Sequence, residues 1–121
     1  MSAAAGDTVL VVDDDAVFRS LARRMIDDAR LVVVGEADGV AAALTAAATL
    51  RPDAVLVDVG LPDGDGIALA GQLCALPWRP RVVLTSTDPD AASPDDVRAC
   101  GARAFVPKHE LPNALERLLA G

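Results

Sequence analysis

Five short runs of apolar and β-branched residues recur along this chain, and each is followed by a segment with helical spacing of its apolar positions. The runs are Thr8–Val12, Leu31–Val34, Ala54–Val57, Val82–Leu84 and Ala104–Val106. Their apolar residues do not alternate with polar ones, which is typical of strands buried on both faces of a sheet. This strand–helix alternation constrains the fold most, because it favours a parallel sheet covered by helices on both faces.

The segments between and after the runs predict five helices, because apolar residues recur in them every three or four positions. They are residues 16–29, a stretch from the N-cap Asp38 to Pro52, residues 66–76, a stretch from Ser93 to Gly101, and a last helix from Leu111 to Leu119. The apolar stripe of the first helix is Val17, Phe18, Leu21, Ala22, Met25 and Ile26. Right-handed crossovers leave few topologies, and a site in such folds lies beyond the carboxyl ends of the strands.

Composition narrows the class of protein. With 121 residues the chain fits one domain, for which we expect a disordered lead over residues 1–7 and a domain over residues 8–121. The net charge of −7 argues against a nucleic-acid-binding surface, and no apolar run reaches the roughly 18 residues of a membrane span. The start of the chain does not resemble a secretory signal, so we expect a cytoplasmic protein in which Cys74 and Cys100 are reduced thiols.

Chemically active side chains follow four of the five predicted strands. The first strand is followed by Asp13, Asp14 and Asp15, the third by Asp58, the fourth by Thr85 and the fifth by Lys108, the only lysine. Because strands one and three are neighbours in the usual sheet order, their carboxylates converge. Two carboxylates about 4 Å apart repel by about 4 kcal/mol at an effective dielectric constant near 20. A lysine and a hard cation such as Mg²⁺ or Mn²⁺ would relieve this repulsion, so the set indicates phosphoryl transfer.

Other acidic residues have simpler expected roles. Asp15 and Asp65 are expected to cap the helices that follow them, and Asp63 is expected to be solvated. An alternative role for Thr85 is structural, with its hydroxyl hydrogen-bonded to the backbone at the end of its strand.

These pieces together resemble the receiver domain of two-component response regulators over residues 8–120. The matching motifs are Val11–Asp14, Asp58 with Leu61-Pro62 and Asp65-Gly66, Leu84-Thr85, and Gly101–Lys108. The resemblance implies a doubly wound, flavodoxin- and CheY-like α/β fold with strand order 2-1-3-4-5. Val34–Ala37, Arg51–Asp53 and Leu61–Gly66 look most like NarL/FixJ-type receivers, which implies transcriptional control through a DNA-binding domain outside this chain.

The resemblance also implies a role for each site residue. Asp58 would accept a phosphoryl group from the phosphohistidine of a sensor histidine kinase, and the domain would catalyse only its own phosphorylation and dephosphorylation. Asp14 and Asp58 would ligate Mg²⁺ directly, with Asp13 acting through a metal-bound water and Gly60 through its backbone carbonyl. Lys108 would bind the phosphoryl oxygens.

The resemblance further implies that phosphorylation changes one surface of the domain. Thr85 would turn toward the phosphoryl group and Phe105 would move inward, altering the face formed by the fourth and fifth predicted strands and the last two helices. A homodimer formed on phosphorylation is left open, and no direct nucleic-acid or membrane contact is expected. The sequence departs from the family where His109 follows Lys108 in place of the common proline, and where Phe105 replaces the common tyrosine.

Two alternatives stay open at this point. The chain could be a degenerate receiver that binds partners without being phosphorylated. Val11–Val17 also resembles the Asp-x-Asp-x-Val motif of haloacid-dehalogenase-type phosphatases, in which Asp13 would be the nucleophile and Asp15 the general acid.

Overall fold

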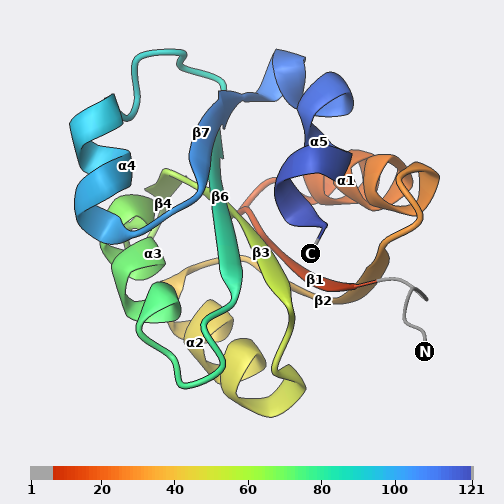
Figure 1. Cartoon of the computed structure of the whole chain (residues 1–121), viewed down its shortest axis with the longest axis horizontal. Coiled ribbons are helices and arrows are strands. Elements are labelled where there is room, and N and C mark those ends of the chain that lie inside the picture. Colours follow the sequence, from red (N-terminus) through yellow and green to blue (C-terminus); the bar gives the residue numbers. More distant parts are fainter. Residues whose placement is uncertain (1–6, 121) are drawn as a thin grey trace.

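A five-stranded parallel sheet forms the middle layer of the computed structural model, which describes residues 7–120 (Figure 1). Its strands are β1 (Thr8–Val12), β2 (Val32–Ala37), β3 (Ala54–Asp58), β6 (Arg81–Ser86) and β7 (Ala104–Pro107). They lie in the order β2-β1-β3-β6-β7, which is the predicted order 2-1-3-4-5 of the long strands. Two short strands, β4 (Gly60–Leu61) and β5 (Gly64–Asp65), form a separate antiparallel hairpin between β3 and the next helix.

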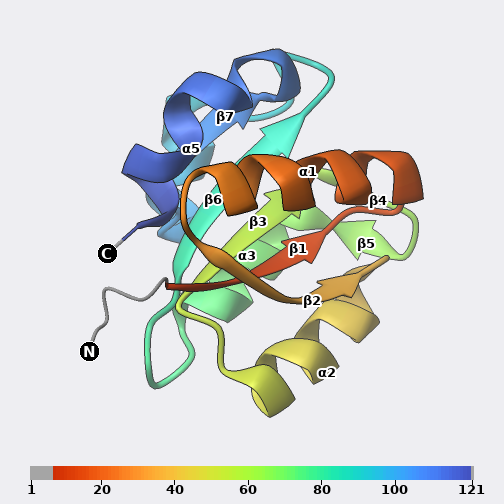
Figure 2. The ribbon, with the colours of Figure 1, turned by 90° about the vertical axis from the view of Figure 1, so that its right-hand side faces the viewer.

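Helices cover both faces of the sheet, as Figures 1 and 2 show. On one face lie α1 (Ala16–Asp28) and α5 (Leu111–Leu119), and on the other lie α2 (Val40–Leu50), α3 (Gly66–Cys74) and α4 (Pro94–Cys100). A single 3₁₀ turn, η1 (Lys108–Glu110), joins β7 to α5. The predicted doubly wound α/β fold is therefore confirmed. None of the helices within residues 7–120 is long and apolar enough to cross a membrane.

Along each strand, alternate apolar residues face opposite sides of the sheet and so belong to two different cores. Val9 and Val11 of β1 face α1 and α5, whereas Leu10 and Val12 face α2 and α3. All four are at most 1% exposed, as expected of a central parallel strand. The predicted stripe of α1 is partly wrong: Phe18, Ala22 and Ile26 are buried, but Val17 and Leu21 are 78% and 51% exposed. The sheet covers only one side of the helix, and these two residues lie outside the contact.

Most predicted helix ends are confirmed. The side chains of Asp15, Asp65 and Ser93 accept hydrogen bonds from the first turns of α1, α3 and α4. Asp38 is not the N-cap of α2, because that position is occupied by Gly39, which has no side chain to offer. The second and fourth strands are longer than predicted, so that Gly35 lies within β2 and Thr85 within β6.

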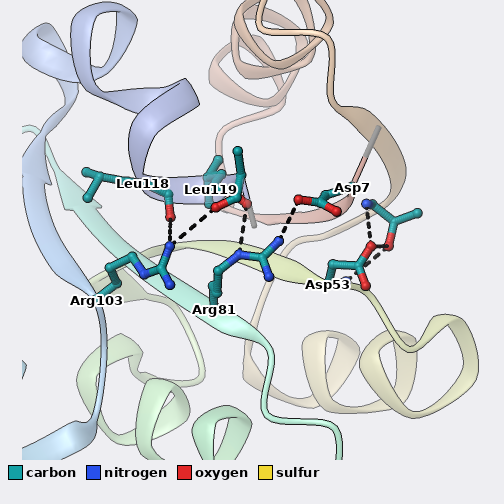
Figure 3. A network of polar contacts seen from close by, with 8 residues as sticks. Asp7, Asp53, Arg81, Arg103, Leu118 and Leu119 are labelled. Carbon is teal, nitrogen blue, oxygen red and sulfur yellow. Dashed lines mark hydrogen bonds and ion pairs between the residues drawn. The ribbon is translucent and has the colours of Figure 1, made fainter. Parts of the chain in front are cut away.

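A polar network at the amino edge of the sheet joins the two ends of the described chain (Figure 3). Arg81 forms an ion pair with Asp7 at 2.9 Å and donates from Nε to the carbonyl of Leu119. Arg103 donates to the carbonyls of Leu118 and Ala120, each at 3.3 Å. Guanidinium groups at a helix C-terminus satisfy carbonyls that lack partners within the helix. The arginines therefore hold the last turn of α5. Of the expected lead over residues 1–7, all but Asp7 lie outside the described residues.

Gly66, the first residue of α3, lies directly beneath the end of β3. Its amide donates to the carbonyl of Val59 at 2.8 Å. A Cβ atom at this position would lie 2.1 Å from the carbonyl oxygen of Asp58 and 2.7 Å from Cα of Val59. Only glycine allows α3 to approach the strand that carries Asp58.

We predict that Gly66→Ala destabilises the fold by about 1–3 kcal/mol or more, because the neighbouring atoms belong to the backbone and must move as a unit. Chemical denaturation with urea measures this change. Gly60→Ala is the matched control, since a Cβ there would meet no atom within 4 Å and should change the free energy of unfolding by less than about 0.5 kcal/mol. Equal stability of the two variants would contradict the prediction.

Candidate functional site

Three carboxylates meet at the carboxyl edge of the sheet. Asp13 and Asp14 follow β1, and Asp58 is the last residue of β3, the strand that pairs with β1 in parallel. One oxygen of each carboxylate lies within 4.8 Å of one oxygen of each of the others. Asp13 is fully buried, Asp58 is 9% exposed and Asp14 is exposed. The predicted convergence of these residues is therefore found in the structure.

Lys108 provides the positive charge of the cluster. Its Nζ lies 2.7 Å from Oδ2 of Asp13 and 3.5 Å from Oδ2 of Asp58. The same ammonium lies 4.0 Å from the centre of the Phe18 ring, a contact that the sequence did not indicate. Burial lowers the pKa of Lys108, but the hydrogen bond and charge of Asp13, together with Asp58, outweigh burial and raise it. Lys108 is thus held in its charged form.

Asp58 lies in surroundings that disfavour its own charge. Burial raises the pKa of Asp58, and the nearby charge of Asp13 raises it further. A hydrogen bond of 3.1 Å from the amide of Gly60 to Oδ1, and the charge of Lys108, act in the opposite direction without cancelling the rise. One ammonium does not compensate three carboxylates, so the site retains an excess of negative charge.

The donor set suits a hard divalent cation. All three side chains offer carboxylate oxygens, the ligand type that Mg²⁺ prefers. The two oxygens of Asp13 already have partners: Oδ1 accepts from the amide of Asp15 at 2.8 Å, and Oδ2 contacts Lys108. Asp58 has partners of the same two kinds but at longer distances, 3.1 Å from the Gly60 amide and 3.5 Å from Lys108, so its oxygens are held less closely than those of Asp13. Gly60 lies in β4, close enough for its amide to bond to the carboxylate of Asp58.

Thr85 and Phe105 flank the cluster on β6 and β7. Thr85 pairs with Asp58 across the sheet and is fully buried. Its hydroxyl donates to the carbonyl of Val106 at 2.7 Å, which is the backbone-bonded alternative considered from the sequence. Phe105 is half-buried and lines a cavity of about 400 Å³ together with residues of α4 and the loop before it.

Arg19 supports the loop that carries Asp13, a role that the sequence did not indicate. Its Nη1 donates to the carbonyl of Asp13 at 2.7 Å, and its Nε donates to Glu36 at 2.8 Å. Arg23 binds the other oxygen of Glu36, and hydrogen bonds from the two arginines lower the pKa of this carboxyl. The spacing of Arg19 and Arg23 by four residues places them on one face of a helix. Nothing in the sequence indicated Glu36, on β2, as their shared partner.

We predict that Asp58→Asn makes the metal-free fold more stable at pH 7 than the wild type. In the unfolded chain the carboxyl of Asp58 has an ordinary pKa of about 3.8, and folding raises it. Between these two values the folded protein binds more protons, so wild-type stability falls as pH rises through this window. The asparagine of the variant does not titrate and has no such loss. Urea denaturation at pH 7 and at pH 3.5 should show an advantage for Asp58→Asn that shrinks at the lower pH, and a constant difference would contradict this account.

Comparison with known proteins places this site in a family. Residues 9–120 match the family described as response regulator receiver domain. The DNA-binding transcriptional activator DevR/DosR of Mycobacterium tuberculosis is 39% identical over 117 residues, covering 93% of this chain and 54% of that protein. This chain spans about half the length of the curated relatives it matches.

Two solved structures show the same fold. A two-component response regulator of the LuxR family from Aurantimonas sp. SI85-9A1 has a TM-score of 0.83 and 26% identity, covering 96% of this chain and 86% of that chain. The signal receiver domain of the response regulator NarL from Mycobacterium tuberculosis has a TM-score of 0.79 and 31% identity, covering 96% and 98%. The chain therefore belongs to the response regulator receiver domains of two-component systems, whose members similar to it include transcriptional regulators.

Proposed function

We propose that this receiver is a phosphorylation-dependent switch that accepts a phosphoryl group on Asp58 from the phosphohistidine of a sensor histidine kinase. The observation that carries the proposal is the position of Asp58, at the end of β3, with a lysine ammonium and two further carboxylates around it. Family membership supports the same role. Asp13 and Asp14 differ from Asp58 in setting, because Asp13 is buried against Lys108 and Asp14 is exposed.

The transfer is a displacement at phosphorus. A carboxylate oxygen of Asp58 forms the new O–P bond while the N–P bond of the phosphohistidine breaks, and the imidazole leaves with that electron pair. The product is an acyl phosphate on Asp58. Lys108 lies 3.5 Å from this carboxylate and would pair with the phosphoryl oxygens. Mg²⁺ held by Asp14, Asp58 and the Gly60 carbonyl would supply charge neutralisation, with Asp13 acting through a bound water.

The output would follow from a change around Thr85. Its hydroxyl donates to the backbone of β7 in the present structure, so a turn toward a phosphoryl group on Asp58 would break that bond. Phe105, which lines a pocket of about 400 Å³ with residues of α4, would then move inward into the space that Thr85 vacates. The altered surface of α4, β6, β7 and α5 would control an output, in line with relatives that are named transcriptional regulators.

We propose that the DNA-binding domain lies outside this chain, that the protein works in the cytoplasm, and that phosphorylation promotes a homodimer.

The two alternatives have less support. In the phosphatase hypothesis Asp15 acts as a general acid, but its side chain accepts a hydrogen bond of 2.9 Å from the amide of Val17 as the N-cap of α1. A degenerate receiver would lack part of the acidic cluster or the lysine, and both are present here. Direct phosphorylation distinguishes the degenerate receiver from an active one.

We predict that acetyl phosphate and Mg²⁺ phosphorylate the wild-type chain once, on Asp58, and that Asp58→Asn abolishes this label while leaving the fold intact. Intact-mass spectrometry and peptide mapping measure the product, an acyl phosphate formed with release of acetate. Asp65→Asn is a matched control, since Asp65 lies seven residues away and its side chain caps α3 outside the acidic cluster. Label on Asp13, or an unlabelled wild type, would overturn the proposal.

We also predict that Asp14→Asn weakens Mg²⁺ binding by at least about tenfold, because one of few direct anionic ligands is removed. Asp14 is exposed, so its replacement should leave the unfolding midpoint almost unchanged. Isothermal titration calorimetry of wild type, Asp14→Asn and the control Asp90→Asn, which lies outside the acidic cluster, measures the three affinities. Equal Mg²⁺ affinity of wild type and Asp14→Asn would overturn the assignment of this ligand.

A further inference from the structure

The β4–β5 hairpin follows Asp58 immediately and carries Gly60. It pairs only Gly60 with Asp65 and Leu61 with Gly64, and it is not part of the main sheet. A hairpin of this size has too few contacts to hold its own shape in water. Its placement beside the acidic cluster therefore depends on contacts with the rest of the domain.

Asp63, at the tip of this hairpin, binds the first turn of α2. Its Oδ1 accepts from the amide of Val40 at 2.7 Å and its Oδ2 from the amide of Ala41 at 3.1 Å. These amides have no partners within the helix, and the positive end of the helix dipole favours a carboxylate. The same two hydrogen bonds lower the pKa of Asp63. Asp63 is exposed, as the sequence predicted, but its carboxylate also caps α2, a contact that the sequence did not indicate.

Two glycines make this contact sterically feasible. Gly39 is the N-cap of α2, and a Cβ there would lie 2.6 Å from Oδ1 of Asp63. A Cβ on Gly64 would lie 3.0 Å from Cγ2 of Val40. The cap of α2 comes from a residue more than 20 positions away because the local N-cap residue offers no side chain and leaves room for the Asp63 carboxylate.

The other end of the hairpin bonds to the phosphoacceptor strand. The amide of Gly60 donates to Oδ1 of Asp58 at 3.1 Å, and the amide of Gly66 donates to the carbonyl of Val59 at 2.8 Å. The hairpin is thus attached at the acidic cluster, at α2, and through Leu61, which packs against the core on the α2 and α3 face of the sheet. The second attachment consists of the two hydrogen bonds of the Asp63 carboxylate.

We propose that Asp63 is a positioning residue, which fixes the β4–β5 hairpin against α2 and thereby holds Gly60 in place for cation binding next to Asp58. The proposal rests on the proposed function only where it concerns the cation. Asp63 itself lies outside the acidic cluster and touches neither the cation ligands nor Lys108.

The test separates positioning from capping with two variants. Asp63→Ala removes both the cap of α2 and the attachment of the hairpin. The double variant Asp63→Ala with Gly39→Ser restores a cap at the N-cap position itself, because the three atoms nearest to a Cβ at Gly39 belong to the Asp63 carboxylate. The backbone of Gly39 is extended, with φ of −172°, so serine fits it without strain. Ser93→Ala is the control that removes a helix cap far from the hairpin.

We predict three results for these variants. Asp63→Ala lowers the urea midpoint, raises hydrogen exchange of the hairpin amides, Gly60 included, about tenfold without metal, and weakens Mg²⁺ binding by calorimetry about tenfold. The double variant regains the urea midpoint but keeps the fast exchange and the weak Mg²⁺ binding. Ser93→Ala lowers the urea midpoint and leaves hairpin exchange and Mg²⁺ affinity at their wild-type values.

Two outcomes would overturn the proposal. If the double variant regains wild-type Mg²⁺ affinity along with stability, Asp63 serves α2 alone. If hairpin exchange in Asp63→Ala equals that of the wild type, the carboxylate does not hold the hairpin. A wild-type protein that binds no Mg²⁺ would instead overturn the proposed metal site, and hydrogen exchange would still decide whether Asp63 positions the hairpin.

Discussion

The pairing of one lysine ammonium with two converging carboxylates is the interaction on which the rest of the site depends. Lys108 directly follows β7, and its Nζ contacts the buried Asp13 at 2.7 Å. A carboxylate buried without a partner is strongly destabilising, so this ion pair makes the burial of Asp13 tolerable. It also requires that the ends of β1, β3 and β7 lie at one edge of the sheet. The parallel fold and the charge balance of the site therefore depend on each other.

The charge balance of the site is incomplete. Three carboxylates face a single ammonium, and both burial and Asp13 raise the pKa of Asp58. In the proposed function, a cation or a phosphoryl group at Asp58 would change the charge of the cluster directly. Two contacts link this region to its surroundings: the Thr85 hydroxyl bonds to β7, and the hairpin after Asp58 is attached to α2. If Asp58 is phosphorylated as we propose, the change would meet two physical connections, one to β6 and β7 and one to α2.

The features that could be predicted from the sequence are those governed by nearby residues. Asp15, Asp65 and Ser93 cap the helices that follow them, because an N-cap side chain reaches amides only two or three positions along. The same rule failed for α2, where Asp38 was expected and the cap comes from Asp63 across the loop. The exposed Val17 and Leu21 show the same limit. Helical spacing indicated an apolar stripe, but only the packing of α1 on the sheet determined how wide the buried part of it is.

The sequence by itself determined the five strands of the parallel sheet and their alternation with helices. It thereby also determined the edge of the sheet where Asp13, Asp14, Asp58 and Lys108 meet. Local apolar patterns predict which segments are strands and that they are connected in parallel. The topology then brings the ends of these strands together. Only the tertiary structure decided that Lys108 lies closer to Asp13 than to Asp58, and that Asp63 holds α2. These choices depend on side-chain distances between segments far apart in the chain, which no local pattern encodes.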